Sequence, residues 1–440
     1  MTESAVTLLP NSAANPFRSR WTKALFIVAL VAISAFPEDI ERIRVLSLGG
    51  YQIVVVDLIY FCLLISAFRA IGSGHSWDVG LSSRLYIFFL GWLSICVILG
   101  LFKFGYRALG ESRYVLPFVG YFLPYSLNPD RDSNSDRDIV RLLTTTVVIC
   151  GLISFIMFWI EVAHGGRFFI SVANQAEFGS PEDFRGMRYL GSSQTFNIMA
   201  LAAFLAVRAL CSRKISFLHL ASTVILILIA ILTKNRAGLF SITVGFLVLL
   251  VCRGNIRQLL LFVTCGLLIG VTIAAYSSDA FENATLAIES GLNPTEDETG
   301  IWRLALNGAA LEQGMETPLV GQGFGGYFYF VVPGMEPIEA PPHNQFVYLF
   351  LKTGFMGALL CFLILATFFK KTLHRVRFPL SEEAATIHSW LLVIVVSQLV
   401  YGLVYGFVPL FGFFVGCGTI LQRVSHTDGN TYRQVTRPTV

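Results

Sequence analysis

The sequence predicts an all-α fold, a polytopic transmembrane helix bundle of about twelve spans with one large extracytoplasmic loop between the ninth and tenth spans. Of the 440 residues, 55% are hydrophobic and only 14% are charged, whereas soluble domains carry about 25% charged residues. Apolar runs of about 20 residues, the length that crosses a bilayer as a helix, recur along the chain. Residues 277–342 form the one long polar interval between these runs.

The apolar runs lie near residues 24–36, 51–70, 85–102, 114–127, 139–160, 190–211, 215–233, 237–252, 258–276, 344–369, 386–403 and 405–421. The fourth contains Pro117 and Pro124 and the last two are nearly continuous, so the count is expected to hold within one or two spans. The first run follows basic residues as in a signal peptide, but the runs after it favour an uncleaved membrane helix. The predicted order is a cytoplasmic tail at 1–22, a membrane bundle of about nine spans at 23–276, the extracytoplasmic loop at 277–342, further spans at 343–421 and a cytoplasmic tail at 422–440.

The distribution of lysine and arginine predicts the orientation of the bundle. These residues gather in the short connections on one side, which places both chain termini in the cytoplasm. The 277–342 loop then lies outside, and its charged residues other than Arg303 are acidic. Lys234 and Arg236 oppose this pattern, because they occupy a tight outside turn directly before an apolar run. An anion bound at the outer surface would offset their unfavourable placement.

The composition argues against several functional classes. The formal net charge is only +4 and the basic residues are scattered at span ends, so no nucleic-acid partner is expected. The eight cysteines lie in apolar runs without close pairs, so we expect no disulfide, no structural metal and no cofactor. The acidic run Glu296–Glu298 is either a ligand set for a divalent cation or, as we favour, a solvated charge cluster.

Arg236, Arg303 and His343 are the candidate catalytic residues. Guanidinium groups bind phosphate oxygens bidentately, so the two arginines suit a diphosphate leaving group. The alternatives are that Arg236 snorkels to the interface and that Arg303 pairs with a nearby glutamate. A Pro-Pro pair before His343 allows a helix to begin at His343 or Asn344. His343 then accepts a proton from a sugar hydroxyl, hydrogen-bonds a phosphate or hydroxyl, or caps the helix.

Other charged residues have both a functional and a structural interpretation. Arg185 and Arg188 precede the sixth span, where they extend the anion site or pair with neighbouring acids; function is favoured for Arg188 and pairing for Arg185. Asp57 and Lys352 lie within apolar runs, where an unpaired charge costs about 2.5–3.5 kcal/mol, so each is expected to lie near the interface or to be paired. Glu161 is either a carboxylate partner or an interface residue.

Four blocks of sequence, in their order and spacing, resemble the O-antigen ligase and polymerase superfamily. They are Leu232–Gly238 (LTKNRAG), Trp302–Leu311 (WRLALNGAAL), Pro318–Gly325 (PLVGQGFG) and Pro342–Gly357 (PHNQFVYLFLKTGFMG). The last block is the most specific, because His-Asn begins a predicted helix and a glycine follows about ten residues later. The resemblance covers residues from about 190 to 370, whereas the first 180 residues match only as a row of apolar runs.

The resemblance implies a metal-independent glycosyltransferase of surface polysaccharide assembly, active on the outer face of the bacterial inner membrane. Its implied donor is an undecaprenyl-diphosphate-linked glycan. Its implied acceptor is lipid A-core for a ligase, or another lipid-linked glycan for an O-antigen or exopolysaccharide polymerase. The implied partners are the lipid bilayer and other polysaccharide assembly proteins.

Residue by residue, Arg236, Arg303 and His343 match the family's functional arginines and histidine, and Arg188 matches more loosely. Asn235 stands where the family usually has a small polar residue, and Lys234 adds a charge. The predicted substrate-binding residues are Arg188, Arg185, Asn344 and Lys234.

Two other functions stay open: a transporter or flippase of a lipid-linked saccharide, and a non-catalytic assembly factor. Transporters often contain internal repeats and helices that are broken near the membrane midplane. The sequence has no evident repeat, and its distinctive residues lie at the predicted outer surface. The glycosyltransferase is therefore the preferred hypothesis.

Overall fold

The computed structural model describes residues 16–35, 43–48, 51–72, 81–122, 135–164, 192–211, 236–254, 298–326, 328–330, 338–339, 342, 344–379, 381–403 and 412. Its helices are α1 (Pro16–Ala35), α3 (Val55–Gly72), α4 (Leu81–Phe104), α5 (Tyr106–Glu111), the 3-10 helix η1 (Ser112–Val115), α6 (Leu116–Val119), α7 (Ser135–Ala163), α9 (Ser192–Cys211), α11 (Arg236–Arg253), α14 (Glu298–Gly314), α15 (Gln345–Arg377) and α16 (Glu382–Gly402). Two antiparallel hairpins pair β1 (Arg44–Leu48) with β2 (Tyr51–Val54) and β3 (Tyr329–Phe330) with β4 (Ile338–Glu339).

Five of the described helices, α4, α7, α9, α15 and α16, are long and apolar enough to cross a membrane, and α11 is a shorter apolar helix. They indicate a multi-pass membrane protein and confirm the helical prediction for five of the longer apolar runs. The runs at 215–233 and 258–276, and nearly all of 405–421, lie outside the described residues. The full count of twelve spans therefore stays a prediction.

Two apolar runs differ from the prediction of continuous helices. Residues 51–54 form a strand instead, because they pair with β1 across Gly49 and Gly50, and a glycine pair is typical of a tight hairpin. The fourth run begins as the short segments η1 and α6 rather than as one helix. Proline at position 117, within α6, lacks the N–H that a longer helix would use.

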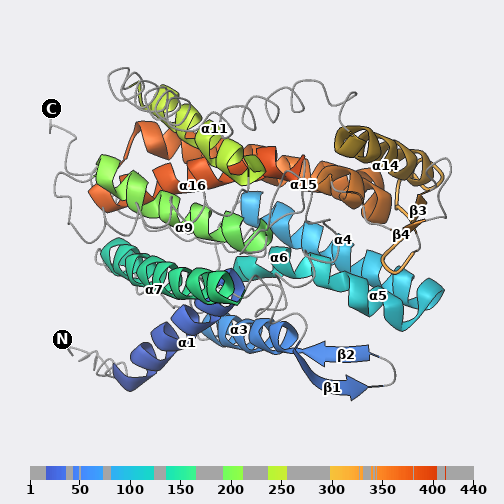
Figure 1. The fold of residues 1–440 in the computed structure, drawn as a ribbon, viewed down its shortest axis with the longest axis horizontal. Helices are drawn as coiled ribbons and strands as arrows, with labels where there is room; N and C mark the ends of the chain where they lie inside the picture. The colour runs from blue at the N-terminus through green and yellow to red at the C-terminus, as the bar shows by residue number, and fades with distance from the viewer. Residues whose placement is uncertain are drawn as a thin grey trace, which may run out of the picture.

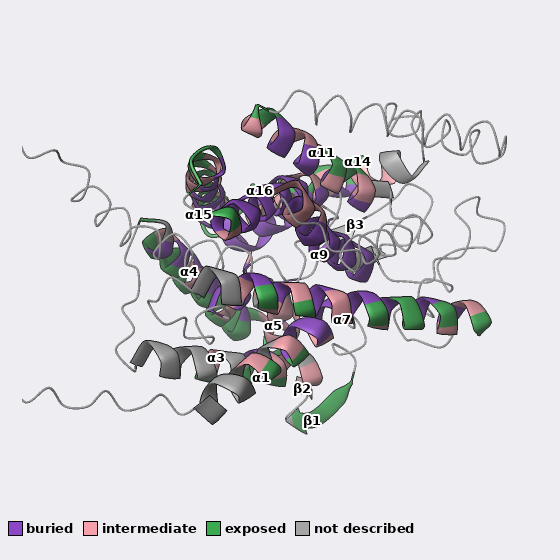
Figure 2. Cartoon of the chain, turned by 90° about the vertical axis from the view of Figure 1, so that its left-hand side faces the viewer, coloured by how far each residue is buried: buried purple, intermediate pink, exposed green. Residues whose placement is uncertain are grey.

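The described helices form a bundle around α9 and α16. Both are largely buried, and the Trp390 Nε1–H of α16 donates to the Ala200 oxygen of α9 at 2.8 Å. α11 packs closely on α16, since a Cβ at Gly245 would lie 2.5 Å from the Val393 oxygen. α4 and α7 instead carry many exposed residues (Figure 2). Exposed apolar side chains such as Phe88 and Phe102 on α4 suit a helix that faces lipid.

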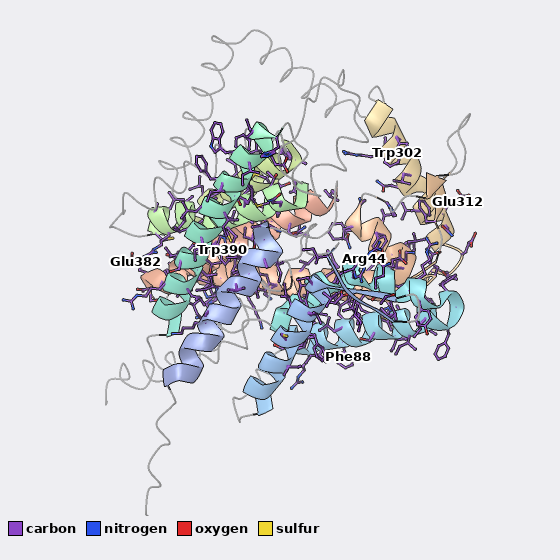
Figure 3. All side chains as sticks on the ribbon, turned by 60° about the horizontal axis from the view of Figure 1, so that its bottom comes forward. Arg44, Phe88, Trp302, Glu312, Glu382 and Trp390 are labelled. Atoms are coloured by element: carbon purple, nitrogen blue, oxygen red, sulfur yellow. The ribbon has the colours of Figure 1, made fainter. Side chains whose placement is uncertain are left out.

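The non-membrane elements gather at one end of the molecule. Figure 1 shows α5, α14 and both hairpins together at this end. In Figure 3, Glu382 at the start of α16 lies toward the opposite end from α14, which Trp302 and Glu312 mark. The predicted topology assigns the first group to the outside and Glu382 to the cytoplasm. The two groups are thus separated along the bundle, while their assignment to the two sides of the membrane stays a prediction.

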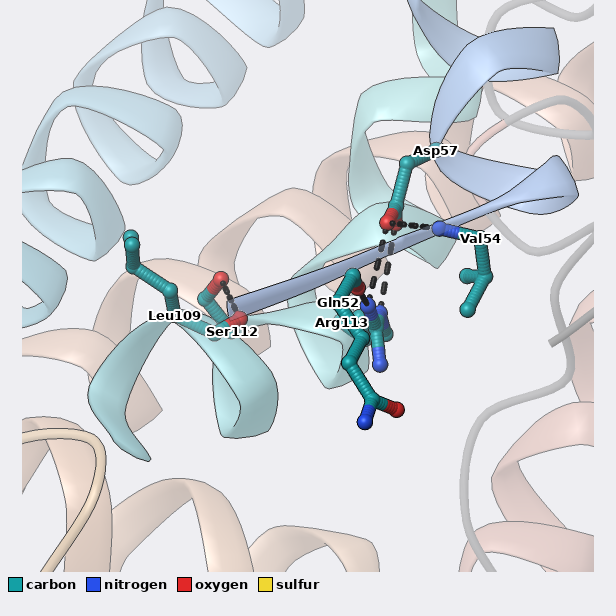
Figure 4. A network of polar contacts seen from close by, with 6 residues as sticks. All are labelled: Gln52, Val54, Asp57, Leu109, Ser112 and Arg113. Carbon is teal, nitrogen blue, oxygen red and sulfur yellow. Dashed lines mark hydrogen bonds and ion pairs between the residues drawn. The ribbon is translucent and has the colours of Figure 1, made fainter. Parts of the chain in front are cut away.

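Asp57 forms an ion pair, one of the two alternatives expected for a carboxylate in an apolar run. Its Oδ2 lies 3.1 Å from Nη2 of Arg113 and accepts the backbone N–H of Val54 at 3.0 Å (Figure 4). Arg113 also donates to the backbone oxygen of Gln52. Asp57 lies in the first turn of α3, where a carboxylate that reaches back to the preceding backbone N–H stabilises the helix start. The ion pair joins the start of α3, directly after β2, to η1.

Helix α15 is broken at Gly354, where φ is 67° and ψ is −170°. This conformation is essentially restricted to glycine. Helical hydrogen bonding is interrupted there, so nearby backbone groups need other partners. We call residues 345–353 the first half of α15 and residues 355–377 its second half.

Residues 318–326, the glycine segment, supply these partners. The N–H groups of Gln322 and Gly323 donate to the oxygens of Leu351 and Lys352 at 3.0 and 3.1 Å. The Phe355 N–H of the second half donates to the Pro318 oxygen at 2.7 Å.

Trp92 of α4 donates through Nε1 to the oxygen of Thr353 at 2.9 Å. A non-helical segment inside an apolar bundle is tolerated only where protein groups satisfy its backbone. The glycine segment and α4 together meet this requirement at the break.

Candidate functional site

Helix α14 brings Arg303 to the N-terminal end of α15. In the sequence, the apolar residues within Gly300–Gln313 recur at helical spacing and predict a helix there, and the observed helix begins two residues earlier, at Glu298. Leu306 and Ala310 of α14 form a buried cluster with Leu351 of α15, and Val347 packs against it. Val347 lies less than one turn from the start of α15. The packing therefore sets the half-buried Arg303, one turn before Leu306, on an element in contact with the start of α15.

Asn344 is the N-cap of α15. Its backbone is extended, and its Oδ1 accepts the N–H groups of Phe346 and Val347 at 3.0 and 3.2 Å. The prediction that a helix begins at His343 or Asn344 is confirmed with Asn344 as the cap, so His343 directly precedes it in the sequence. Because Oδ1 is engaged, the group of Asn344 left for a substrate is the Nδ2 amide. The positive end of the helix dipole at this point favours anions.

The remaining predicted site residues are not placed by the structure. Arg236 is the first residue of α11, but its side chain lies outside the described residues. His343, Arg188, Arg185 and Lys234 also lie outside them. The structure thus brings together the helix of Arg303 and the cap Asn344, and the roles of all seven residues stay predictions.

A buried ion pair joins the first half of α15 to α5. Nζ of Lys352, in the first half of α15, is 2.9 Å from Oε1 of Glu111 and donates to the Gly326 oxygen at 2.8 Å. The Tyr348 hydroxyl donates to the same Oε1 at 2.9 Å, and the Gly325 N–H donates to Oε2. Of the two alternatives expected for Lys352, a place near the interface or a paired charge, the structure shows the pair, and the partner comes from α5.

Sequence reasoning missed Glu111 and Tyr348 as members of this group. A lysine within an apolar run indicates that a carboxylate must lie nearby. Glu111, between two apolar runs on the predicted outside, was available as that carboxylate. The glycine pattern gave no indication that the segment reaches α5, because that contact depends on the docking of residues 318–326 against two helices.

Chemically, the described part of this end suits an anion. The guanidinium group of Arg303 can bind two phosphate oxygens at once. A capped helix N-terminus on the adjacent element adds partial positive charge. Lys352 is less suited to direct contact, because its ammonium group is buried and already paired with Glu111.

Comparison with known proteins gives one family match. Residues 221–362 match the family model described as O-antigen ligase. The matched region includes α11, α14, the glycine segment and the first half of α15, and it confirms the resemblance found from the four sequence blocks. No curated protein matches the chain significantly.

Proposed function

From the match of residues 221–362 to the O-antigen ligase family, we propose that this chain is a glycosyltransferase of surface polysaccharide assembly. It moves a saccharide from undecaprenyl diphosphate to a sugar acceptor on the outer face of the bacterial inner membrane. The observation that carries the proposal lies within the matched region: the helix of Arg303 packs against the capped start of α15. An arginine and a helix N-terminus on touching elements suit a diphosphate.

In the proposed reaction, the acceptor oxygen bonds to the anomeric carbon while the bond from that carbon to the diphosphate oxygen breaks. Arg303 and Arg236 stabilise the negative charge that develops on the diphosphate. His343 takes the acceptor's proton or orients its hydroxyl group. Asn344, Arg188, Arg185 and Lys234 bind the substrates around these groups. The diphosphate leaves as a delocalised anion, so the proposal requires no metal.

The test is a transfer assay with purified protein, EDTA and an undecaprenyl-diphosphate oligosaccharide, with and without lipid A-core. A ladder without added acceptor indicates a polymerase, and product only with lipid A-core indicates a ligase. We expect Arg303→Ala and His343→Ala each to lower kcat by about 100-fold or more. Arg44→Ala is the matched control, since Arg44 is an exposed arginine of the β1–β2 hairpin at the same end, and it should retain wild-type turnover. Wild-type protein without turnover on either acceptor would contradict the proposal.

The break in α15 favours a second candidate, transport of a lipid-linked saccharide, since discontinuous membrane helices are typical of transporters. In transporters the exposed backbone at a break lines a substrate cavity. Here the glycine segment and Trp92 occupy the backbone groups at the break. Movement of a labelled donor across the bilayer of proteoliposomes, without any glycan transfer, would favour the transport function over the transferase function.

A further inference from the structure

Lys352 is a charged residue inside a membrane helix, and its side chain is only 2% exposed. Such a residue is costly unless paired, and its usual role is functional. Its contacts tie α15 to Glu111 of α5 and to the Gly326 oxygen of the glycine segment. One ammonium group thus joins three elements that are distant in the sequence.

Glu111 of α5 contacts both α15 and the glycine segment. Its two carboxylate oxygens contact Lys352 and Tyr348, one turn apart on α15, and the backbone N–H of Gly325. Both residues of α15 lie in its first half. The carboxylate therefore holds the first half of α15 and the glycine segment in one fixed arrangement. We call Lys352, Glu111 and Tyr348 the junction.

The junction lies between the break and the cap of α15. Lys352 is two residues before Gly354, and Asn344 lies about two turns earlier. An unbroken helix would fix the first half relative to the second through continuous backbone hydrogen bonds. At Gly354 that continuity is lost, so contacts outside α15 must set the direction of its first half.

Resting on the proposed function, we propose that Lys352 and Glu111 are positioning residues for the transfer reaction. They fix the first half of α15 so that its capped start lies correctly against the helix of Arg303. Neither residue needs to contact substrate for this role. A displacement of about 1 Å within a catalytic arrangement can cost about 100-fold in rate, so a loosened junction would act mainly on kcat.

An ion pair serves this purpose better than apolar packing does. A buried pair is often no more stabilising than well-packed apolar residues of the same volume, but its hydrogen bonds have direction. Removing one partner leaves an uncompensated buried charge and endangers folding. Replacing both partners by neutral residues of similar size removes the charges together and separates positioning from stability.

The test compares wild-type protein with the double variant Glu111→Gln/Lys352→Met. We expect the double variant to fold, with its kcat about 100-fold lower and its KM for the lipid-linked donor within about threefold of wild type. Hydrogen–deuterium exchange of the peptide covering residues 344–353 should be at least about tenfold faster, while α16 stays unchanged. The variant Lys352→Arg keeps the positive charge and the N–H donors, so its kcat should be at least about tenfold higher than that of the double variant.

The matched control removes another described ion pair at the same end. Asp57→Asn/Arg113→Met neutralises a pair that joins α3 to η1 (Figure 4), and Arg113 lies only two residues after Glu111. This control should leave kcat and the exchange of residues 344–353 at wild-type values. An equal effect from the control would overturn the proposal, because it would show a general loss of order at this end.

A folded Glu111→Gln/Lys352→Met protein with wild-type exchange in residues 344–353, or with kcat within about threefold of wild type, also overturns the proposal. If that variant fails to fold, Tyr348→Phe replaces it, since this change removes one hydrogen bond and no charge. It should raise exchange in the same peptide and lower kcat about fivefold, and wild-type values for both would refute the role. If the variant exchanges faster in residues 344–353 but the wild-type protein transfers no saccharide, the proposed function is refuted and the positioning of this segment is still supported.

Discussion

Replacing Gly100 by alanine tests whether the glycine segment is docked as the structure shows. A Cβ at Gly100 of α4 would lie 2.9 Å from the backbone carbon and nitrogen of Phe324 and closer still to its oxygen. Carbon atoms prefer separations of about 3.5–4.0 Å, so the segment must move by about 1 Å. Because these are backbone atoms, no rotation of a side chain can relieve the contact.

The magnitude follows from the hydrogen bonds that this movement would break. The Gln322 and Gly323 N–H groups bond to α15 at 3.0 and 3.1 Å, so a shift of that size takes both beyond bonding distance. Each lost buried hydrogen bond costs about 1–3 kcal/mol. Alanine in place of helical glycine returns about 1 kcal/mol. We therefore expect Gly100→Ala to destabilise the fold by about 1–5 kcal/mol.

The assay is thermal unfolding in detergent together with hydrogen–deuterium exchange of residues 318–326. Gly100→Ala should melt at a lower temperature and exchange faster in this segment. Gly91→Ala is a matched control on the same helix, because nothing lies within 4 Å of a Cβ at that position. It should be neutral or slightly stabilising. If both variants melt at or above the wild-type temperature with wild-type exchange, the docking of the glycine segment on α4 is wrong.

Three further predictions concern single residues. Asn344→Ala should cost about 1 kcal/mol through loss of the cap, whereas Asn344→Asp should keep most of this stability; thermal unfolding of the two variants checks this, and equal melting temperatures would contradict the capping role. Gly354→Ala should cost at least about 2 kcal/mol, because φ is 67° and the new Cβ would lie 2.5 Å from the Val320 nitrogen; retention of wild-type melting would argue for an unbroken α15. Arg113→Ala should destabilise more than Arg113→Ala combined with Asp57→Asn, because the single change removes the cationic partner of the part-buried carboxylate and leaves its charge. Unfolding of both variants measures the difference, and the opposite order would exclude the pair.

Much of the architecture follows from local sequence. Long apolar runs specify membrane helices because an isolated segment in lipid must satisfy its own backbone, and the helix does so within one segment. Neighbouring residues also determine the start of α15, because a Pro-Pro pair followed by His-Asn indicates a helix start, and Asn344 is its cap. The apolar spacing within Gly300–Gln313 likewise predicted α14 within two residues of its observed start. Each of these features depends on neighbours within a few residues.

The site was predicted less completely, for a physical reason. An arginine in an acidic loop and a histidine before a cap indicate an anion site, but not which elements meet there. The break at Gly354 looked like an ordinary part of an apolar run, because the partners of its backbone groups come from residues 318–326 and from Trp92. The β2 strand was likewise taken for the start of a helix, since its pairing with β1 is not a local property of its residues.

The sequence by itself determined that this chain forms apolar membrane helices, where α15 begins, where α14 begins to within two residues, and which residues resemble the O-antigen ligase family. Only the tertiary structure decided that the glycine segment docks at a broken helix and that Glu111 neutralises Lys352. The difference lies in the range of the forces. Helix formation and capping satisfy groups within a few residues of each other, whereas a buried charge and an interrupted backbone are satisfied by whatever the fold brings against them.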